Sequence, residues 1–113
     1  MATIRIMYWK EIPVQVQATD EEKTTSVLLE ERFQQAADSI SMMDGSAGSE
    51  EYLMGWEWGK HMHIDGDAEA TSYKLADKIN SDMPHDFAAR IRDMEISGTR
   101  KPYAGAIDHW MEE

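Results

Sequence analysis

Residues 3–9, with the sequence TIRIMYW, alternate in a way that puts large side chains on both faces of one short segment. β-Branched and aromatic residues dominate this segment, which predicts a β-strand. One face carries Ile4, Ile6 and Tyr8, and the other carries Arg5, Met7 and Trp9. Because Met7 and Trp9 make the second face partly apolar, we expect another part of the protein to cover it.

The next residues predict a second strand. Lys10 to Pro13 have the composition of a turn or bulge, and residues 14–18 (VQVQA) then alternate as a half-buried strand does. Pro13 has no amide hydrogen, so we expect it at the strand start or on a sheet edge. Residues 24–29 (TTSVLL) fit either a short strand or a helix entry.

Three later segments have helical periodicity. The first helix, which should end before Asp44 and Gly45, has a stripe formed by Leu29, Phe33, Ala36, Ile40 and Met43. The second, with Asp67 as its N-cap and Pro84 at its end, has an apolar face formed by Tyr73, Ala76, Ile79 and Met83. The third, over roughly 85–96 with Gly98 at its C′ position, buries Phe87, Ile91 and Met94.

Residues 52–64 alternate more strictly than any other part of the chain. Large side chains share one parity, broken only by Lys60, at Tyr52, Met54, Trp56, Trp58, Met62 and Ile64. This pattern predicts a long strand, or a short helical start that runs into a strand, with a bend at Gly59 and a turn at Asp65–Gly66.

Together these segments predict an α+β fold, a two-layer sandwich with a small, mostly antiparallel sheet and helices packed on one face. We expect one domain over residues 1–98, followed by a C-terminal extension over residues 99–113. In this extension Tyr103, Ile107 and Trp110 recur at amphipathic helical spacing. So short a helix must dock to be stable. Its own domain is the favoured docking surface, and another subunit is the alternative.

Composition limits the classes of partner. The formal charge of −11 disfavours nucleic acid and anionic membrane surfaces, and no apolar run approaches the roughly 20 residues that span a bilayer. The chain has no cysteine, which excludes disulfide scaffolds and thiol chemistry. No signal peptide is recognisable, so we expect a cytoplasmic protein. Residues 1–18 sum to +1, from Arg5 and Lys10 against Glu11, so the first strand is the least repulsive place for an acidic partner.

One cluster has the spacing of a metal site. If residues 57–65 form a single strand, Glu57, His61, His63 and Asp65 project from one face and could hold a divalent ion. A solvated polar strand face explains the same residues without a metal, and we favour that interpretation. No catalytic residue set and no cofactor motif is recognisable, so we lean towards a protein that is not an enzyme.

The segment YWKEIPVQV, residues 8–16, resembles the signature of the small bacterial proteins of the virulence factor family. The resemblance continues in LEERFQQAADSISM and EEYLMGW and covers roughly residues 3–97. The chain departs from the family at Glu30, where relatives often have proline, and after Gly98. The family is associated with virulence but brings with it no activity and no catalytic residues.

These observations favour a non-enzymatic protein-interaction or accessory module. The candidate partner-binding residues are Trp9, Lys10, Gln15, Trp56, Trp58 and Trp110, and the same apolar face could instead form a homo-oligomer. Core packing is the structural alternative, and we favour it for any one of these residues taken alone.

Overall fold

The structure, a computed structural model of the chain, describes residues 1–112. Strands β1 (Ala2–Trp9) and β2 (Ile12–Thr19) form an antiparallel hairpin closed by Lys10 and Glu11. Lys10 takes a left-handed conformation with φ of 50°. The turn at Lys10–Glu11 lies where a turn or bulge was predicted, and a bulge lies further into the hairpin, where the register shifts between Met7 and Tyr8 and Val14 has no partner in β1. Pro13 is the second residue of β2, at the start of the strand and beside this bulge. This position suits proline, because proline has no amide hydrogen to donate to the sheet.

The ambiguous segment TTSVLL forms a strand, β3 (Thr24–Leu28), which pairs with β2. On the other side of β1 lie two short strands, β4 (Trp56–Trp58) and β5 (Met62–Ile64). The order across the 5-stranded sheet is β3-β2-β1, with β4 and β5 both pairing with β1, and every pairing is antiparallel.

The alternation of residues 52–64 therefore belongs to several elements. The chain first forms a short helix, α2 (Glu50–Met54), which matches the predicted helical start. The strand then breaks between Trp58 and Met62, at the predicted bend. Trp58 pairs with Met7 whereas Met62 pairs with Ile4, so the two halves present their large side chains to opposite faces of the sheet. A single long strand was a wrong interpretation of this segment.

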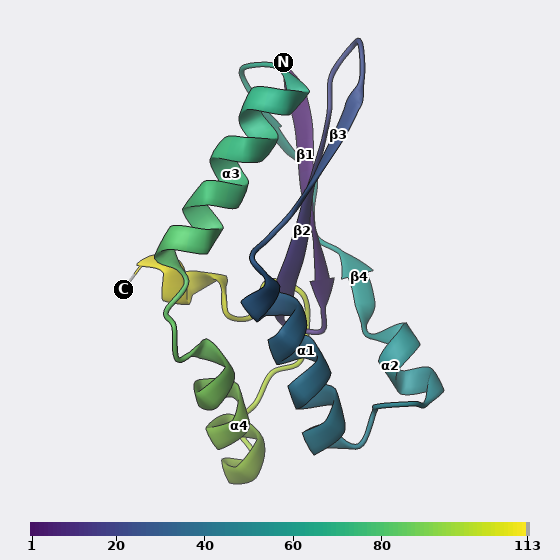
Figure 1. Cartoon of the computed structure of the whole chain (residues 1–113), viewed down its shortest axis with the longest axis vertical. Helices are drawn as coiled ribbons and strands as arrows, with labels where there is room; N and C mark the ends of the chain where they lie inside the picture. Colours follow the sequence, from purple (N-terminus) through teal and green to yellow (C-terminus); the bar gives the residue numbers. More distant parts are fainter. Residues whose placement is uncertain (113) are drawn as a thin grey trace.

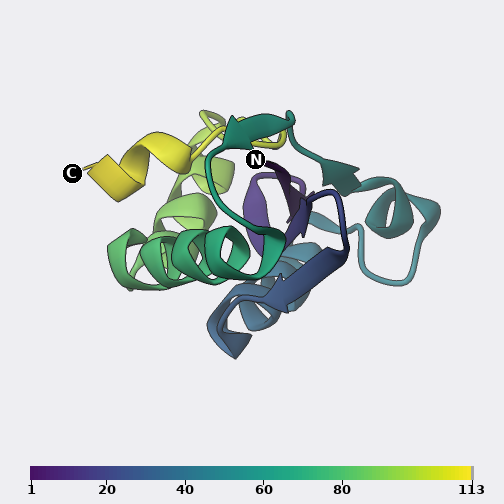
Figure 2. The ribbon, with the colours of Figure 1, turned by 90° about the horizontal axis from the view of Figure 1, so that it is seen from above.

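The remaining helices are α1 (Glu31–Asp44), α3 (Ala68–Asp82) and α4 (Phe87–Ser97). Gly45 and Gly98 adopt the left-handed conformation at the ends of α1 and α4, and Asp67 caps α3 by accepting a hydrogen bond from the amide of Ala70 at 2.7 Å. Figures 1 and 2 show α3 along one side of the sheet. In Figure 1, α1 and α4 lie below α3, and α2 lies apart from the other helices. The predicted α+β class is confirmed, with α1, α3 and α4 on one face of the antiparallel sheet, while the short helix α2 lies over Trp9 on the other face.

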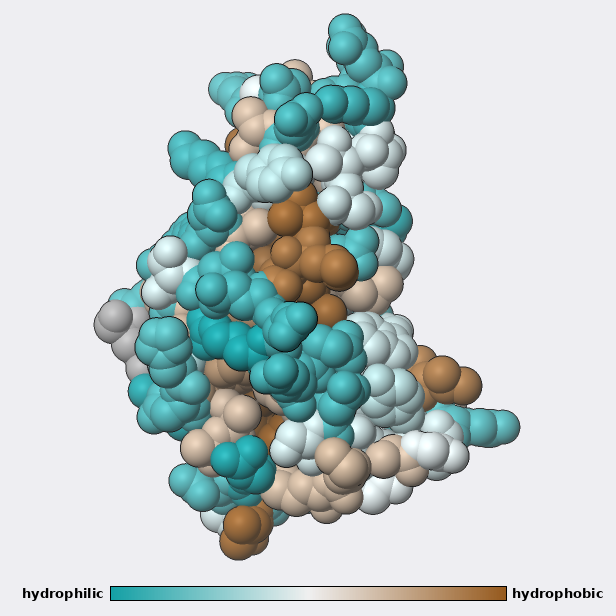
Figure 3. Space-filling model, viewed as in Figure 1, coloured by the Kyte–Doolittle hydropathy of each residue, from teal (hydrophilic) through white to brown (hydrophobic). Residues whose placement is uncertain are grey.

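The core lies between the sheet and these helices. It holds the even-numbered side chains of β1 together with Phe33, Ile40, Ile79 and Ile91 from the helices. Apolar side chains reach the surface between α3 and β3, where the core meets the edge of the sheet (Figure 3). The predicted stripe of α3 needs one correction, because Tyr73 is exposed and its neighbour Ser72 packs inward in its place. The buried side of α3 thus includes Ala68, Ser72, Ala76 and Ile79.

The C-terminal segment packs against the domain. It ends in a short 3-10 helix, Asp108–Glu112, in place of an amphipathic α-helix. Ile107 and Trp110 join the same hydrophobic core as the strands, while Tyr103 remains exposed. In the part of the chain that the structure describes, no helix is long and apolar enough to cross a bilayer.

Candidate docking face

One face of the sheet is left largely uncovered by the helices. The strand register aligns its side chains into rows that run across neighbouring strands. The first row holds Leu28, Gln15, Met7 and Trp58; the second holds Ser26, Gln17 and Arg5; the third holds Thr24, Thr19, Thr3 and His63. We call the surface formed by these residues the open face. The first row, nearest the β1–β2 turn, is mainly apolar. The third row, at the opposite end of the strands, consists of three threonines and His63.

Arg5 is held at the centre of the open face. Its Nε donates a hydrogen bond to Oε1 of Gln17 at 3.0 Å, and its guanidinium carbon lies 3.8 Å from the ring centre of Trp58. Stacking on the indole face fixes the plane of the guanidinium. The Nε bond is the only side-chain hydrogen bond of Arg5 within residues 1–112, so its two terminal nitrogens remain available to an outside acceptor.

The open face differs from the rest of the molecule in its charge. The chain has 22 acidic residues, yet the described strands contribute no aspartate or glutamate to this face. Glu57 pairs with Tyr8 and therefore belongs to the other face. Arg5 is thus a cation on a surface without carboxylates, in a chain of formal charge −11.

The sequence-predicted partner residues fall into different environments. Gln15 and Trp58 lie on the open face, and Trp56 is half-buried beside Tyr52 of α2 at a ring distance of 6.2 Å. Trp9 is fully buried under α2, where its Nε1 donates to the backbone oxygen of Tyr52 at 2.9 Å. A direct contact between Trp9 and a partner is therefore excluded in this fold, and α2 is the element that covers this end of the second strand face.

Trp110 was also predicted as a partner residue, but it is only 8% exposed and packs into the core. Arg90 lies over its ring at 5.3 Å. The docking of the tail on its own domain, which the sequence favoured, is what the structure has. In this fold little of the Trp110 side chain lies at the surface.

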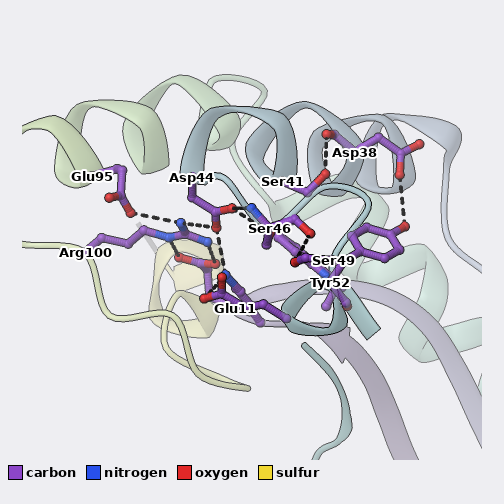
Figure 4. A network of polar contacts seen from close by, with 12 residues as sticks. Glu11, Asp38, Ser41, Asp44, Ser46, Ser49, Tyr52, Glu95 and Arg100 are labelled. Atoms are coloured by element: carbon purple, nitrogen blue, oxygen red, sulfur yellow. Dashed lines mark hydrogen bonds and ion pairs between the residues drawn. The ribbon is translucent and has the colours of Figure 1, made fainter. Parts of the chain in front are cut away.

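Lys10 belongs to a buried network of charges, shown in Figure 4, and not to a docking surface. Its Nζ lies 2.8 Å from Oδ2 of Asp44 at the end of α1. The same oxygen accepts a hydrogen bond from Arg100 at 3.0 Å, and Arg100 also forms a two-point contact with Glu11 at 2.7 and 2.8 Å. The β1–β2 turn supplies Lys10 and Glu11, α1 supplies Asp44 and the tail supplies Arg100, so the network joins these three parts of the chain.

The charged side chains of this network are almost completely buried. The side chains of Glu11 and Arg100 are 1% and 4% exposed. Burial by itself would raise the pKa of Asp44, but hydrogen bonds from Lys10, Ser46 and Arg100 lower it from 3.8 to about 2. The Asp44 carboxylate is therefore charged at neutral pH, and its ion pairs with Lys10 and Arg100 help to hold the fold together.

The predicted metal ligands are not brought together. Glu57 lies in β4, His63 in β5, and His61 in the connection between them, so the single strand on which the cluster depended does not exist. His63 lies on the open face beside Thr3, while Glu57 faces the other way. Among the residues that the structure describes, no three histidine, aspartate or glutamate side chains gather to hold a metal ion.

Most residues of the open face were missed as partner candidates by the sequence reasoning, Arg5 and Leu28 among them. Arg5 was placed with Met7 on the second face of β1 and noted for its charge, but it was not counted among the partner residues. Leu28, which is 73% exposed, lay in the segment whose conformation was ambiguous. Assigning that segment to a strand in register with β2 would have placed Leu28 opposite Gln15.

A sequence model described as virulence factor matches residues 7–91 of the chain. The match begins inside β1 and ends inside α4, so it includes Lys10, Glu11 and Asp44 but not Arg100 or the tail. No curated protein and no solved structure matches the chain significantly.

Proposed function

The chain belongs to the virulence factor family, and we propose that it is a protein-interaction module that docks a partner segment on the open face of its sheet. The partner segment is mainly apolar and carries a carboxylate. The observation that carries this proposal is the absence of acidic residues among the described strand positions of this face, in a chain with 22 of them.

The apolar row supplies the contact area. Leu28, Met7 and Trp58 lie in line across the sheet, with only Gln15 between Leu28 and Met7. Tryptophan and arginine are the side chains that most often dominate binding energies, and methionine is enriched at interfaces. Burying this row under a partner would remove apolar surface from water, which favours association.

Arg5 supplies the specificity for a carboxylate. Its contacts with Gln17 and Trp58 fix the guanidinium before any partner arrives, so less side-chain entropy is lost on binding. The terminal nitrogens are a planar pair of donors that matches the two oxygens of a carboxylate. A partner with many acidic residues is disfavoured by the overall charge of −11, so we expect one or two carboxylates within an apolar segment.

The experiment places a photo-crosslinking residue at Leu28 in cells of the source organism. Ile96 is the matched control position, since it is 82% exposed but lies on α4, away from the open face. We expect a heterologous protein crosslinked from position 28 and not from position 96. The same protein should be lost with Arg5→Gln and kept with Arg92→Gln, a charge-matched change on α4.

The purified pair then gives the energetics. Arg5→Gln should weaken binding at least about tenfold, the lower range for a central interface arginine. Its unfolding midpoint should stay close to that of the parent chain, because Arg5 is half-exposed. Equal crosslinking from positions 28 and 96, or binding that Arg5→Gln leaves unchanged, would refute the docking face. If crosslinks from position 28 form only between copies of the chain, the open face is a surface for self-association and not for a different protein.

A further inference from the structure

A second feature lies on the helix-covered side of the sheet, away from the open face. A cavity of about 470 Å³ opens between β1, α3 and the C-terminal segment. Its walls are mainly apolar, from Ile6, Met62, Leu75 and Met111. Leu75 also lines a neighbouring hollow of about 780 Å³ beside β5. This volume is in the range of small-molecule sites, and the second hollow leaves room for a longer ligand.

The polar end of the cavity is formed by Tyr8 and Asp108. The hydroxyl of Tyr8 donates a hydrogen bond to Oδ2 of Asp108 at 2.7 Å. The other carboxylate oxygen, Oδ1, is buried and accepts no hydrogen bond from any residue between 1 and 112. Burial raises the pKa of the Asp108 carboxyl and of the Tyr8 hydroxyl, which shows how poorly this end is solvated.

Asp108 has no ion-pair partner within residues 1–112, and burial raises its pKa more than the charge of the neighbouring His109 lowers it. Within the described residues no lysine or arginine forms an ion pair with it, whereas Asp44 contacts both Lys10 and Arg100. A buried carboxylate with a free acceptor atom and no ion pair is costly, and the cost falls when a charged donor binds beside it. The missing component is therefore a cationic hydrogen-bond donor.

We propose that this cavity binds a primary amine with an apolar tail. The ammonium group lies between Oδ1 of Asp108 and the hydroxyl oxygen of Tyr8, and the tail covers Ile6, Met62 and Leu75. An ammonium has three donors, so it satisfies the orphan carboxylate oxygen and still donates to the tyrosine oxygen, whose own hydrogen is used by Asp108.

The chain around the cavity is consistent with a site that is kept open. A side chain at Gly59 would begin 2.8 Å from the ring of Tyr8, so only glycine leaves this ring in place. Gly105 has φ of 86°, which favours glycine at the opposite wall. Met111, which also lines the cavity, is unbranched and flexible, so its side chain can move to admit a ligand. Lys60 lies at the cavity with an exposed side chain, and solvent screens its charge there.

The test compares three probes of equal length on the intact chain at neutral pH: n-hexylamine, n-hexanol and hexanoate. Amide and methyl NMR shifts of Ile6, Met62 and Leu75 report binding in the cavity. We expect hexylamine to bind about tenfold more tightly than hexanol, the difference that a charge-assisted contact adds, and hexanoate to bind least.

Two variants separate the proposed contact from a general effect on folding. Asp108→Asn should remove the preference for hexylamine over hexanol while both still enter the cavity, and Tyr8→Phe should reduce it. Asp93→Asn, an exposed carboxylate on α4, should leave the preference unchanged. The ratio between two probes on one variant does not depend on how stable that variant is.

Equal affinities for hexylamine and hexanol on the parent chain would overturn the proposal, since the cavity would then be merely apolar. Tightest binding by hexanoate would also overturn it and would assign the anchor to Lys60. Persistence of the amine preference in Asp108→Asn would refute the role of this carboxylate. None of these results bears on the open face, which lies on the other side of the sheet.

Discussion

At the scale of single residues, the charges of the β1–β2 turn show what a local pattern cannot reveal. Lys10 and Glu11 follow a strand and precede a proline, which is typical of a solvated turn. In the structure Glu11 is 1% exposed, because Arg100, which lies 89 residues further along the chain, pairs with it. No periodicity connects residues so far apart. The sequence could predict the turn but not the burial of its charges.

Asp44 gives this network a measurable pH dependence. Its pKa in the folded chain is about 2, against an ordinary value of 3.8. The unfolded chain therefore takes up this proton first as the pH falls. The contribution of Asp44, about 2 kcal/mol, is complete above about pH 4 and is lost as the pH falls towards 2. Urea unfolding at a series of pH values should show this loss.

The variant Asp44→Asn identifies the source of the effect. It should be less stable than the parent chain at neutral pH, with the difference shrinking as the pH falls through this window. Asp93→Asn is the control, because it changes one exposed carboxylate and should reproduce the pH profile of the parent. A constant difference between Asp44→Asn and the parent from neutral pH to about pH 2 would show that this carboxylate is not the titrating group.

At the scale of elements, the regular helices and strands were predictable and the irregular ones were not. The apolar stripe of α1 and the N-cap of α3 depend on neighbouring residues; the N-cap was confirmed, and so was the stripe except at Met43, which is exposed. The apparent long strand over residues 52–64 depended on parity alone. The connection from Gly59 to His61 shifts the chain between faces of the sheet, which parity cannot detect. The open face could therefore be predicted only in part, as Gln15 and Trp58 but not as aligned rows.

Gly59 is the residue on which this shift depends. An alanine there would place its Cβ 2.8 Å from Cε2 of Tyr8, a ring that is 4% exposed and cannot easily move. We expect Gly59→Ala to destabilise the chain by about 1–3 kcal/mol, the usual cost of overpacking. Lys60→Ala changes the next residue, whose side chain is exposed, and should stay within about 0.5 kcal/mol of the parent. Equal urea midpoints for both variants would show that the connection adapts freely.

At the scale of the whole molecule, the tail completes the domain although the family match ends before it. Residues 7–91 match the family, while Arg100, Ile107 and Trp110 all lie beyond the match. The sequence divided the chain after Gly98 because the tail has its own proline and its own amphipathic spacing. Burial instead joins the tail to the core of strands and helices. A boundary inferred from local composition does not account for a segment that supplies the counter-charge of a buried glutamate.

Truncation after Gly98 should therefore unfold the chain or leave it without a cooperative transition. It removes Arg100 and so leaves Glu11 and Asp44 buried with only Lys10 nearby, and loss of one partner of a buried ion pair costs about 3–5 kcal/mol. It also removes Ile107 and Trp110 from the core, at a further cost of a few kcal/mol. The sum is comparable to the whole stability of a domain of this size, about 5–15 kcal/mol.

Two further chains locate the cause of this loss. Truncation after Met111 removes only the last two residues and should unfold in urea like the parent. Arg100→Gln keeps Ile107 and Trp110 in place and should fall between the parent and the chain truncated after Gly98. If the chain of residues 1–98 unfolds cooperatively at the midpoint of the intact protein, the tail is an attachment and not a part of the domain. Binding experiments that compare the intact protein with the shortened one depend on this result, because a partner lost on truncation is informative only if the shortened chain is folded.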